Sequence, residues 1–489
     1  MADNFESTMT DTNINIKKLM FLVAGMLIFA LVYYAPPWPD AVDRIGRHFL
    51  LSQAGKGALA LALLATTWWI FEVVPVGVTS LAIGVIQVFF LIRPAKAAFA
   101  DFMDPSVMFI FASIVIGIVF TKTGLTKRMA YKMLVVIGEK TSMIYLGCFI
   151  LIAALTHIMA HTAVAATVYP LLLSIYELYG QPDEQTRFGK GLFMGMAYVA
   201  GAGSIVTLLG AARGAVAIGF FKNIVGREVD FFQLSYYMFP IGWLMVFLLW
   251  GFFMIFFKPE KRVIFGLKER ALRLHKELGP LSKKEIIAMA IVLGCIIALS
   301  LHSFFPALHF LDKTAVILTS TIIFFVTGIL DINDLEEIPW NIILLFAGAM
   351  SLGFCLWETG AAKWLAIKWL MMFHNASSFF FIMSIAFFVM IMTNVIMNVA
   401  AIAISLPVAL VLASYFGVTP DVILYASLVV AGMPFFLLVG AAPNAIAYES
   451  KQFTAGEFFF YGLLASTMLI IVVGFAVYIL WPLMGMSIH

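Results

Sequence analysis

Apolar runs about as long as a bilayer is thick recur along the whole chain, and they limit its fold more than any other feature. A helix needs roughly 20 apolar residues to cross the hydrocarbon core. Runs of this kind predict eleven crossings, at residues 19–36, 56–75, 77–94, 106–122, 188–222, 238–257, 286–303, 313–331, 339–358, 422–448 and 456–483. We therefore predict an all-α polytopic membrane protein.

The composition excludes a soluble protein. Hydrophobic residues make up 63% of the chain and charged residues 12%, whereas soluble domains average roughly 45–50% and ~25%. A globule of this size needs more charge to cover its surface. The net charge of +3 is small and gathered mainly in one segment, so no nucleic-acid partner is expected.

The sequence contains no pattern typical of an enzyme or a metal site. Cys148, Cys295 and Cys355 lie within apolar runs without paired spacing, so neither a disulfide nor a metal–thiolate site is expected. No phosphate-binding loop or Ser/His/Asp arrangement stands out. The first apolar run has no small-residue cleavage site before Pro36-Pro37, so it is read as a retained helix and not as a cleaved signal.

Positive charge predicts the orientation of the chain. The linker 258–285 carries nine of the 30 Lys and Arg residues, which places it in the cytoplasm by the positive-inside rule. We expect an amphipathic helix there, with Leu267, Leu272 and Leu274 toward the membrane surface. Lys17-Lys18 places the N-terminus inside as well, and six crossings return the chain to the linker on the same side. A location in the cytoplasmic (inner) membrane of a bacterium follows as an expectation.

Two apolar stretches, 142–177 and 377–415, are too long for one span and are interrupted midway by polar residues. We predict that each is a re-entrant helical hairpin. The runs 188–222 and 422–448 are broken at their centres by glycine, proline and other small residues, which predicts interrupted helices.

An internal repeat relates the two halves. LTHIMAHTAVAATVYP at 155–170 matches MTNVIMNVAAIAISLP at 392–407 with a shift of 237 residues. Two further blocks match in the same order, with shifts of 236 and 230. An odd number of crossings in each copy predicts opposite orientations in the membrane, which is typical of secondary transporters. The predicted segments are a cytoplasmic start with the first helix (1–54), a first repeat (55–257), the linker (258–285) and a second repeat (286–489).

The hairpin tips and the helix breaks are the expected site. Non-helical backbone at membrane depth occurs only where protein or a water-filled cavity satisfies it. Free N–H groups at helix ends attract anions, and free carbonyl groups can hold Na⁺. We therefore expect the tips Thr156–Thr162 and Thr393–Val399 to meet the breaks Gly201–Gly214 and Gly432–Asn444. Few acidic residues lie deep in the spans, so the site suits an anion.

WWIFEVVPVGVTSL at 68–81 resembles the signature of the divalent-anion:sodium symporters, which transport dicarboxylates, citrate or sulfate. The Ser-Asn-Thr hairpin tips of that family correspond to Ala160-His161-Thr162 and Met397-Asn398-Val399. Its Gly-(Thr/Ser)-Pro-Pro-Asn breaks correspond to GAARG at Gly210–Gly214 and GAAPN at Gly440–Asn444. The resemblance extends from about residue 55 to the C-terminus. It implies a scaffold with a moving transport domain, an elevator-type mechanism and a homodimer.

The same resemblance implies two sodium sites and an anion site between them. The second-half sodium site would use Thr393, Asn398, Gly440 and Ala441, and the first-half site would use Thr156, position 161, Gly203 and Gly210. The anion would contact position 161, Thr162, position 213, Asn398, Val399, Ala442 and Pro443. Position 161 is His, and Arg213 stands where the family has proline. We therefore predict that the first half has lost sodium binding and that His161 or Arg213 supplies positive charge to the anion.

Each of these residues also has a structural interpretation. His161 can be a neutral histidine bonded to a hairpin carbonyl. Arg213 can extend from a helix end to the interface and pair with an acidic neighbour. Thr162 and Asn398 keep the family residue, which favours direct substrate contact.

The sequence thus predicts a secondary active transporter of a small divalent anion, such as a dicarboxylate, sulfate or a sulfonate. Coupling is expected either to a sodium ion, by symport, or to exchange against another anion, by antiport. The alternatives are a cation/proton antiporter of the same architecture, which needs buried carboxylates in the breaks, and an anion channel. A membrane enzyme or sensor finds no support.

Overall fold

The computed structural model describes residues 16–42, 47–180, 184–305, 308, 311–372 and 377–488. Residues 1–15 of the predicted N-terminal segment lie outside these ranges. The fold is mostly helical, with one small antiparallel pair of strands, β1 (Ala41–Val42) and β2 (His48–Phe49), in which Ala41 lies opposite Phe49.

The helices before the linker comprise the predicted spans, the first hairpin and several short additional helices. They are α1 (Ile16–Tyr33), α2 (Gln53–Ile70), α3 (Val76–Phe89), α4 (Ala95–Ala100), η1 (Asp101–Met103), α5 (Pro105–Thr123), α6 (Leu125–Ile137), α7 (Thr141–Thr156), α8 (His161–Tyr179), α9 (Arg187–Gly203), α10 (Ala212–Val225) and α11 (Phe231–Phe256).

The second half begins with the helix in the linker. Its helices are α12 (Leu267–Glu277), α13 (Lys283–His302), α14 (Lys313–Val326), α15 (Ile332–Glu336), α16 (Trp340–Glu358), α17 (Ala361–Met372), α18 (Ser378–Val395), α19 (Asn398–Tyr415), α20 (Pro420–Ala431), η3 (Leu438–Gly440), α21 (Ala442–Tyr448), α22 (Ala455–Phe475), η4 (Ala476–Leu480) and α23 (Trp481–Leu483).

Local sequence explains where several of these helices begin and end. Asp104 accepts a hydrogen bond from Ser106 N at the start of α5, where Pro105 occupies the first turn. Gly124 has a left-handed φ of 84°, which ends α5 and turns the chain into α6. A capping box of Ser282 and Glu285 starts α13.

Both predicted hairpins are helix–turn–helix units, α7–α8 and α18–α19. Both predicted interrupted helices are broken near the expected residues, between α9 and α10 and between α20 and α21. The order long helix, short helix, hairpin, broken helix, long helix therefore occurs once from α5 to α11 and again from α16 to α22.

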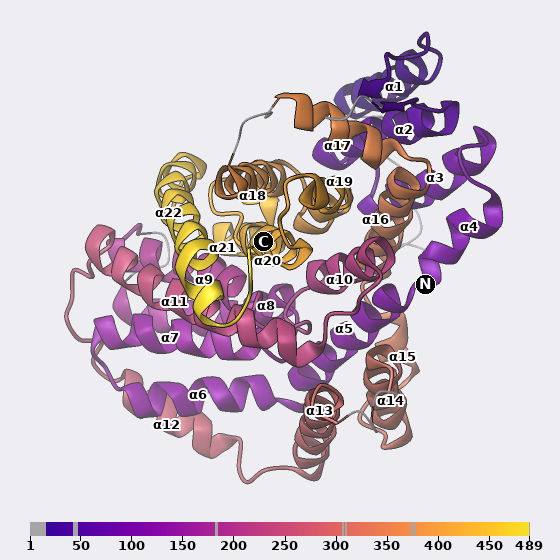
Figure 1. The fold of residues 1–489 in the computed structure, drawn as a ribbon. Helices are drawn as coiled ribbons and strands as arrows, with labels where there is room; N and C mark the ends of the chain where they lie inside the picture. The colour runs from indigo at the N-terminus through magenta and orange to yellow at the C-terminus, as the bar shows by residue number, and fades with distance from the viewer. Residues whose placement is uncertain are drawn as a thin grey trace.

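The hairpins and broken helices lie together in the body of the molecule (Figure 1). In this view α1 to α4 and α17 lie at the upper right, and α13 to α15 lie at the lower right. Helix α5 runs between the two regions, where it packs against α10 and α14. Helices α6 and α12 lie side by side at the lower left.

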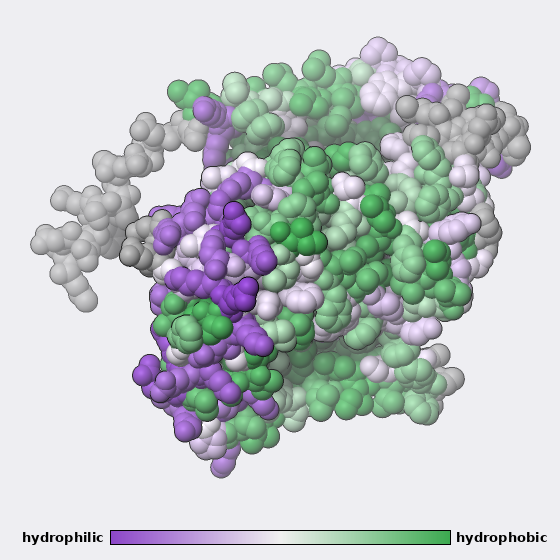
Figure 2. All heavy atoms as spheres, turned by 90° about the vertical axis from the view of Figure 1, so that its left-hand side faces the viewer, coloured by the Kyte–Doolittle hydropathy of each residue, from purple (hydrophilic) through white to green (hydrophobic). Residues whose placement is uncertain are grey.

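The surface and the helix lengths fit a membrane protein. Within the described ranges, nine helices are long and apolar enough to cross a bilayer. Figure 2 shows a broad hydrophobic surface with hydrophilic residues gathered along one edge. Large hydrophobic side chains are exposed there and elsewhere, among them Leu293, Val326 and Ile471.

The linker helix α12 differs from expectation in one respect. Leu267 is only 3% exposed and packs in the protein core, so the prediction that it faces the membrane surface is wrong. The reason is α6, an amphipathic helix that covers this side of α12. Leu272 and Leu274 are half-buried.

Candidate substrate and ion site

In the first half, the hairpin tip is held against the break between α9 and α10. The His161 N–H donates to Gly210 O at 3.0 Å, and Thr207 Oγ1 donates to His157 O at 2.8 Å. A Cβ atom on Gly210 would lie 2.5 Å from Thr156 O, and one on Gly203 would clash with Thr156 Oγ1. The expected first-half ion residues Thr156, Gly203 and Gly210 therefore come together, with His161 beside them.

The second half repeats this arrangement with different groups. Thr393 Oγ1 donates to Ala431 O at the end of α20, at 3.1 Å. A Cβ atom on Gly440 would lie 3.0 Å from Thr393 O, so tip and break are again in close contact. The amide oxygen of Asn394 accepts from Phe436 N at 3.0 Å and from Leu437 N at 3.2 Å.

The two breaks touch each other. A Cβ atom on Gly201, near the end of α9, would lie 2.7 Å from Gly432 O, which follows α20. A Cβ atom on Gly432 would lie 2.6 Å from Arg213 Nη2 and would clash with Ile205. Glycine at both positions is what allows the carboxyl-terminal ends of α9 and α20 to approach each other.

Arg213 lies at this crossing and is 2% exposed. Its Nη2 donates to Ser204 Oγ at 2.7 Å, and Nη1 has no partner among the described residues. No described carboxylate pairs with it, so the expected alternative of an acidic neighbour is not what the structure shows. Ser204 caps the end of α9 and Gly432 the end of α20, so the guanidinium lies where two helix dipoles present their negative ends.

The two histidines of the first tip differ in their surroundings. His161 Nδ1 lies 3.3 Å from Gly210 O, so its ring rests on the break, within electrostatic range of Arg213. The ring of His157 is turned toward α11, where it lies 5.8 Å from the ring of Trp243. Neither ring nitrogen of His157 has a hydrogen-bond partner among the described residues.

The remaining predicted site residues lie around the second tip and break. Asn398 starts α19 and is 7% exposed. Val399 beside it is buried in the core. Ala441 precedes α21, whose first residues are Ala442 and Pro443. In the first half Thr162 is half-buried on α8, next to His161.

The sequence analysis did not single out Asn394, Asn444 or Ser204. Asn394 and Asn444 bind the backbone of the second break from opposite ends, and Asn444 donates to Pro434 O at 2.8 Å. The sequence did offer one signal for these asparagines, an amide side chain inside an apolar run, because a buried amide needs hydrogen-bond partners. Its partners could not be read from the sequence, since they lie in an irregular segment.

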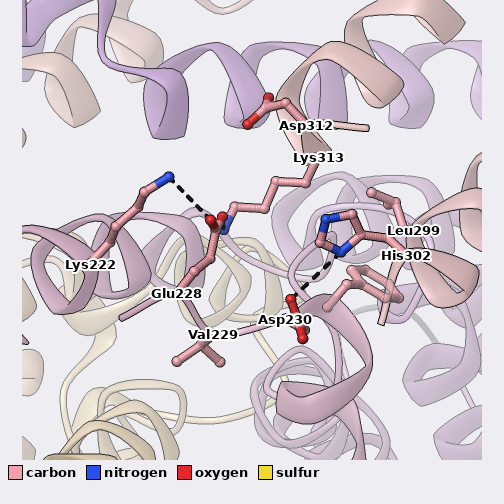
Figure 3. Close-up of a pocket in the computed structure, with 9 residues that line it drawn as sticks. Lys222, Glu228, Val229, Asp230, Leu299, His302, Asp312 and Lys313 are labelled. Carbon is pink, nitrogen blue, oxygen red and sulfur yellow. Dashed lines mark hydrogen bonds and ion pairs between the residues drawn. The ribbon is translucent and has the colours of Figure 1, made fainter. Parts of the chain in front are cut away.

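A separate cavity of about 220 Å³ lies away from these residues, between the α10–α11 loop and the α13–α14 loop. Figure 3 shows its charged lining: Lys313 and Lys222 both bind the carboxylate of Glu228, at 2.7 and 3.1 Å, and His302 faces Asp230 at 3.6 Å. Burial raises the pKa of Glu228, but the hydrogen bonds and charges of the two lysines outweigh burial and hold it below its ordinary value. The opposite charges here are already paired, so this cavity is a poor candidate for an anion site.

Comparison with known proteins identifies a family and relatives that this chain resembles. The profile of the family described as the sodium:sulfate symporter transmembrane region matches residues 16–487. The sodium-dependent dicarboxylate transporter SdcS of Staphylococcus saprophyticus is 23% identical, with 98% of this chain and 94% of that protein covered. SdcS of Staphylococcus aureus is 24% identical, with 96% of this chain and 93% of that protein covered.

Solved structures agree in fold. MtrF of Neisseria gonorrhoeae, described among antimetabolite efflux pumps, superposes with a TM-score of 0.57 at 12% identity, covering 97% of this chain and 96% of that one. The YdaH transporter of Alcanivorax borkumensis superposes with a TM-score of 0.53 at 11% identity, covering 96% and 98%. The match over nearly the full length shows that this chain belongs to the sodium:sulfate symporter family of membrane transporters.

Proposed function

We propose that this protein is a secondary transporter of a small divalent anion, and that Arg213 supplies the positive charge that the family resemblance assigns to a first sodium ion. The observation that carries the proposal is the burial of Arg213 without a carboxylate partner. An ionised group inside a membrane protein is costly and is typical of a functional site. The missing negative charge is then that of the transported anion.

The position of Arg213 favours replacement of an ion. It lies at the carboxyl-terminal ends of α9 and α20, next to Ser204 and the residue pair Thr156–Gly203. Carbonyl groups at such half-helix ends hold Na⁺ in related architectures. A guanidinium there occupies the same electrostatic position and repels a free cation, so the first-half sodium site is proposed to be lost.

The second break, Gly432–Asn444, contains no Lys or Arg. Thr393 and the backbone of Gly440 offer neutral oxygen atoms near the end of α20, and with Asn398 and Ala441 they are proposed to hold one sodium ion. The anion is proposed to lie between the two tips, in contact with His161, Thr162, Asn398, Val399, Ala442 and Pro443. Binding energy then comes from Arg213, from free N–H groups at the starts of α8, α19 and α21, and from the ion when one is bound.

The names of the relatives support a substrate class. The SdcS proteins are named as sodium-dependent dicarboxylate transporters, and the family description names sulfate. A C4-dicarboxylate is our first candidate and sulfate our second. We further propose an elevator-type movement of the hairpins and broken helices against α1–α5 and α13–α17, in a homodimer in the cytoplasmic membrane with the N-terminus inside.

A cation/proton antiporter is the alternative from another mechanistic class, and it needs a buried carboxylate at the breaks. Glu285, which pairs with Arg128 at 2.7 Å at the start of α13, is the one acidic residue among the described buried residues. A channel remains distinguishable by experiment, because it conducts without saturable counterflow.

Uptake into proteoliposomes tests the proposal. Labelled succinate and labelled sulfate are offered with and without an inward Na⁺ gradient, and with and without unlabelled anion inside. Saturable uptake of either anion, driven by Na⁺ or by preloaded anion, supports it. Conductive flux without counterflow, or proton-driven cation exchange with no anion uptake, contradicts it.

A further inference from the structure

A groove of about 310 Å³ lies between α6, α8 and α12, away from the hairpin tips. Figure 1 shows α6 and α12 next to each other on the flank of the molecule. The walls of the groove are apolar faces of all three helices, formed by Ala130, Leu134, Val168, Ile175, Leu267 and Leu274. Such a groove suits a hydrocarbon chain.

One end of the groove is polar and has unsatisfied donors. Thr126, in the first turn of α6, is 1% exposed, lines the groove and has a hydroxyl group with no hydrogen-bond partner among the described residues. A buried hydroxyl without a partner costs free energy unless a ligand completes it. The first α-helical bond of α6 is donated by Arg128 N to Gly124 O. The N–H groups of Leu125, Thr126 and Lys127 therefore precede the ladder and lie at the positive end of the helix dipole.

One cation stands at this end of the groove. Lys127 lines it from α6 and pairs with none of the described side chains. Arg270 lines the other end, where it faces Glu177 of α8 at 3.7 Å, because α6 and α12 are antiparallel: Arg128 at the start of α6 binds Gly279 O past the end of α12, and Glu139 past the end of α6 binds Gly266 N. Hydroxyl, helix N-terminus and Lys127 together form a site for a phosphate group.

The position of the groove indicates whether the phosphate belongs to a lipid or to a soluble molecule. Helix α12 lies in the basic linker, which the distribution of Lys and Arg places on the cytoplasmic side. The hydrophilic edge in Figure 2 adjoins a broad hydrophobic surface. Basic pockets with apolar walls at this level of a membrane protein are typical of anionic lipid sites.

We propose that the groove binds an anionic phospholipid of the cytoplasmic leaflet. The phosphate contacts Thr126, Lys127 and the first N–H groups of α6, and an acyl chain lies along Ala130, Leu134 and Leu274. A bound lipid then contacts α8, the arm of the hairpin that carries His161 at its start. A free phosphate would leave the apolar walls uncovered, which is why a lipid is the occupant.

Native mass spectrometry of the purified full-length protein tests this proposal. The protein is mixed with equal amounts of phosphatidylglycerol and phosphatidylcholine that carry the same acyl chains. We expect phosphatidylglycerol to be retained in preference. The variant Lys127→Ala should weaken retention roughly fivefold, since each cation near a membrane surface contributes to anionic lipid binding. Thr126→Val, which removes the hydroxyl at nearly constant shape, should weaken it as well.

The matched control is Lys132→Ala, because this residue is exposed, lies on the same helix and does not line the groove. This control should retain phosphatidylglycerol as the unchanged protein does. Equal retention of both lipids, or an equal loss in the control, would overturn the proposal. Displacement of the lipid by millimolar inorganic phosphate alone would show a site for a soluble anion and would overturn it too.

Discussion

At the residue scale, the proposed anion transport depends on one buried guanidinium, that of Arg213. Arg213 lies in the first turn of α10, and its charge lies at the carboxyl-terminal ends of two helices without a carboxylate partner among the described residues. Substitution of Arg213 by a neutral residue distinguishes a structural role from a role in anion binding. Loss of one partner of a structural ion pair leaves the other buried charge unpaired and destabilises the fold, whereas loss of an unpaired buried charge does not.

Substitution Arg213→Met keeps much of the side-chain volume and removes the charge. We expect the melting temperature without substrate to hold or rise, because no buried partner is left unpaired. Anion transport should fall at least roughly thirtyfold, since loss of one partner of a buried charge pair costs about 2–5 kcal/mol. Thermal unfolding and succinate uptake, measured on the same preparation, check both parts. Normal transport with a lowered melting temperature would assign Arg213 to structure.

Gly432→Ala is expected to displace the same guanidinium, because the added Cβ would lie 2.6 Å from Arg213 Nη2. Overpacking of this kind costs about 1–3 kcal/mol, so the apparent affinity for the anion should fall roughly tenfold. Gly294→Ala is the control, since a Cβ there meets nothing within 4 Å. Uptake measured over a range of substrate concentrations gives the apparent affinity of each variant for the anion. Equal effects of the two substitutions would show that the contact at Gly432 is unimportant.

Residue roles were only partly predictable. The family resemblance groups Thr156 with Gly203 and Thr393 with Gly440, and the structure brings the members of each pair into close approach; their role in ion binding stays a prediction. The attachment of Asn394 to Phe436 N and Leu437 N was not predicted. The sequence indicates that a buried amide needs hydrogen-bond partners. It does not predict which backbone N–H groups those are, because the break has no regular secondary structure.

At the element scale, the hairpins and breaks were predictable from length and composition. An apolar stretch too long for one span and interrupted by polar residues must turn back, and α7–α8 and α18–α19 do so. The short helices α4, α6 and α17 were not predicted. A search for spans of roughly 20 apolar residues does not detect them, because each is shorter than the bilayer is thick.

The two hairpin–break units are predicted to differ in their use of sodium. Thr393→Val removes the hydroxyl that binds Ala431 O, and we expect the Na⁺ concentration for half-maximal uptake to rise roughly tenfold or more, as for loss of a metal-site group. Thr156→Val, its equivalent in the first half, should leave the Na⁺ dependence unchanged. A Na⁺ titration of succinate uptake compares them. A similar rise in both variants would indicate two working sodium sites.

At the scale of the whole molecule, the charged cavity of Figure 3 connects the two groups of elements that the proposed elevator would move apart. Glu228 follows α10, whereas Lys313 starts α14, and the two bind at 2.7 Å. This relation could not be predicted from the sequence, because it depends on how distant helices pack. The pair is partly exposed and worth at most about 1 kcal/mol, which permits it to open and close during transport.

We expect a cross-link at this pair to stop transport. Cysteines replace Glu228 and Lys313 in a chain without Cys148, Cys295 and Cys355, and a bifunctional thiol reagent joins them. Uptake should be lost and should return when a reductant cleaves the reagent. The control joins Arg227 and Asp421, an ion pair between the α10–α11 loop and the start of α20 on the proposed moving side. Full transport by the chain linked at 228 and 313 would contradict the elevator.

A measurement of how many sodium ions accompany each anion shows whether Arg213 takes the place of the first ion. Initial rates of succinate uptake into proteoliposomes are measured over a range of Na⁺ concentrations at a fixed ionic strength. With Arg213 in place of the first ion, the Hill slope should not exceed about one, because the slope is bounded by the number of sites. A slope near two or above, unchanged in Arg213→Met, would show that both sodium sites work and would contradict the account.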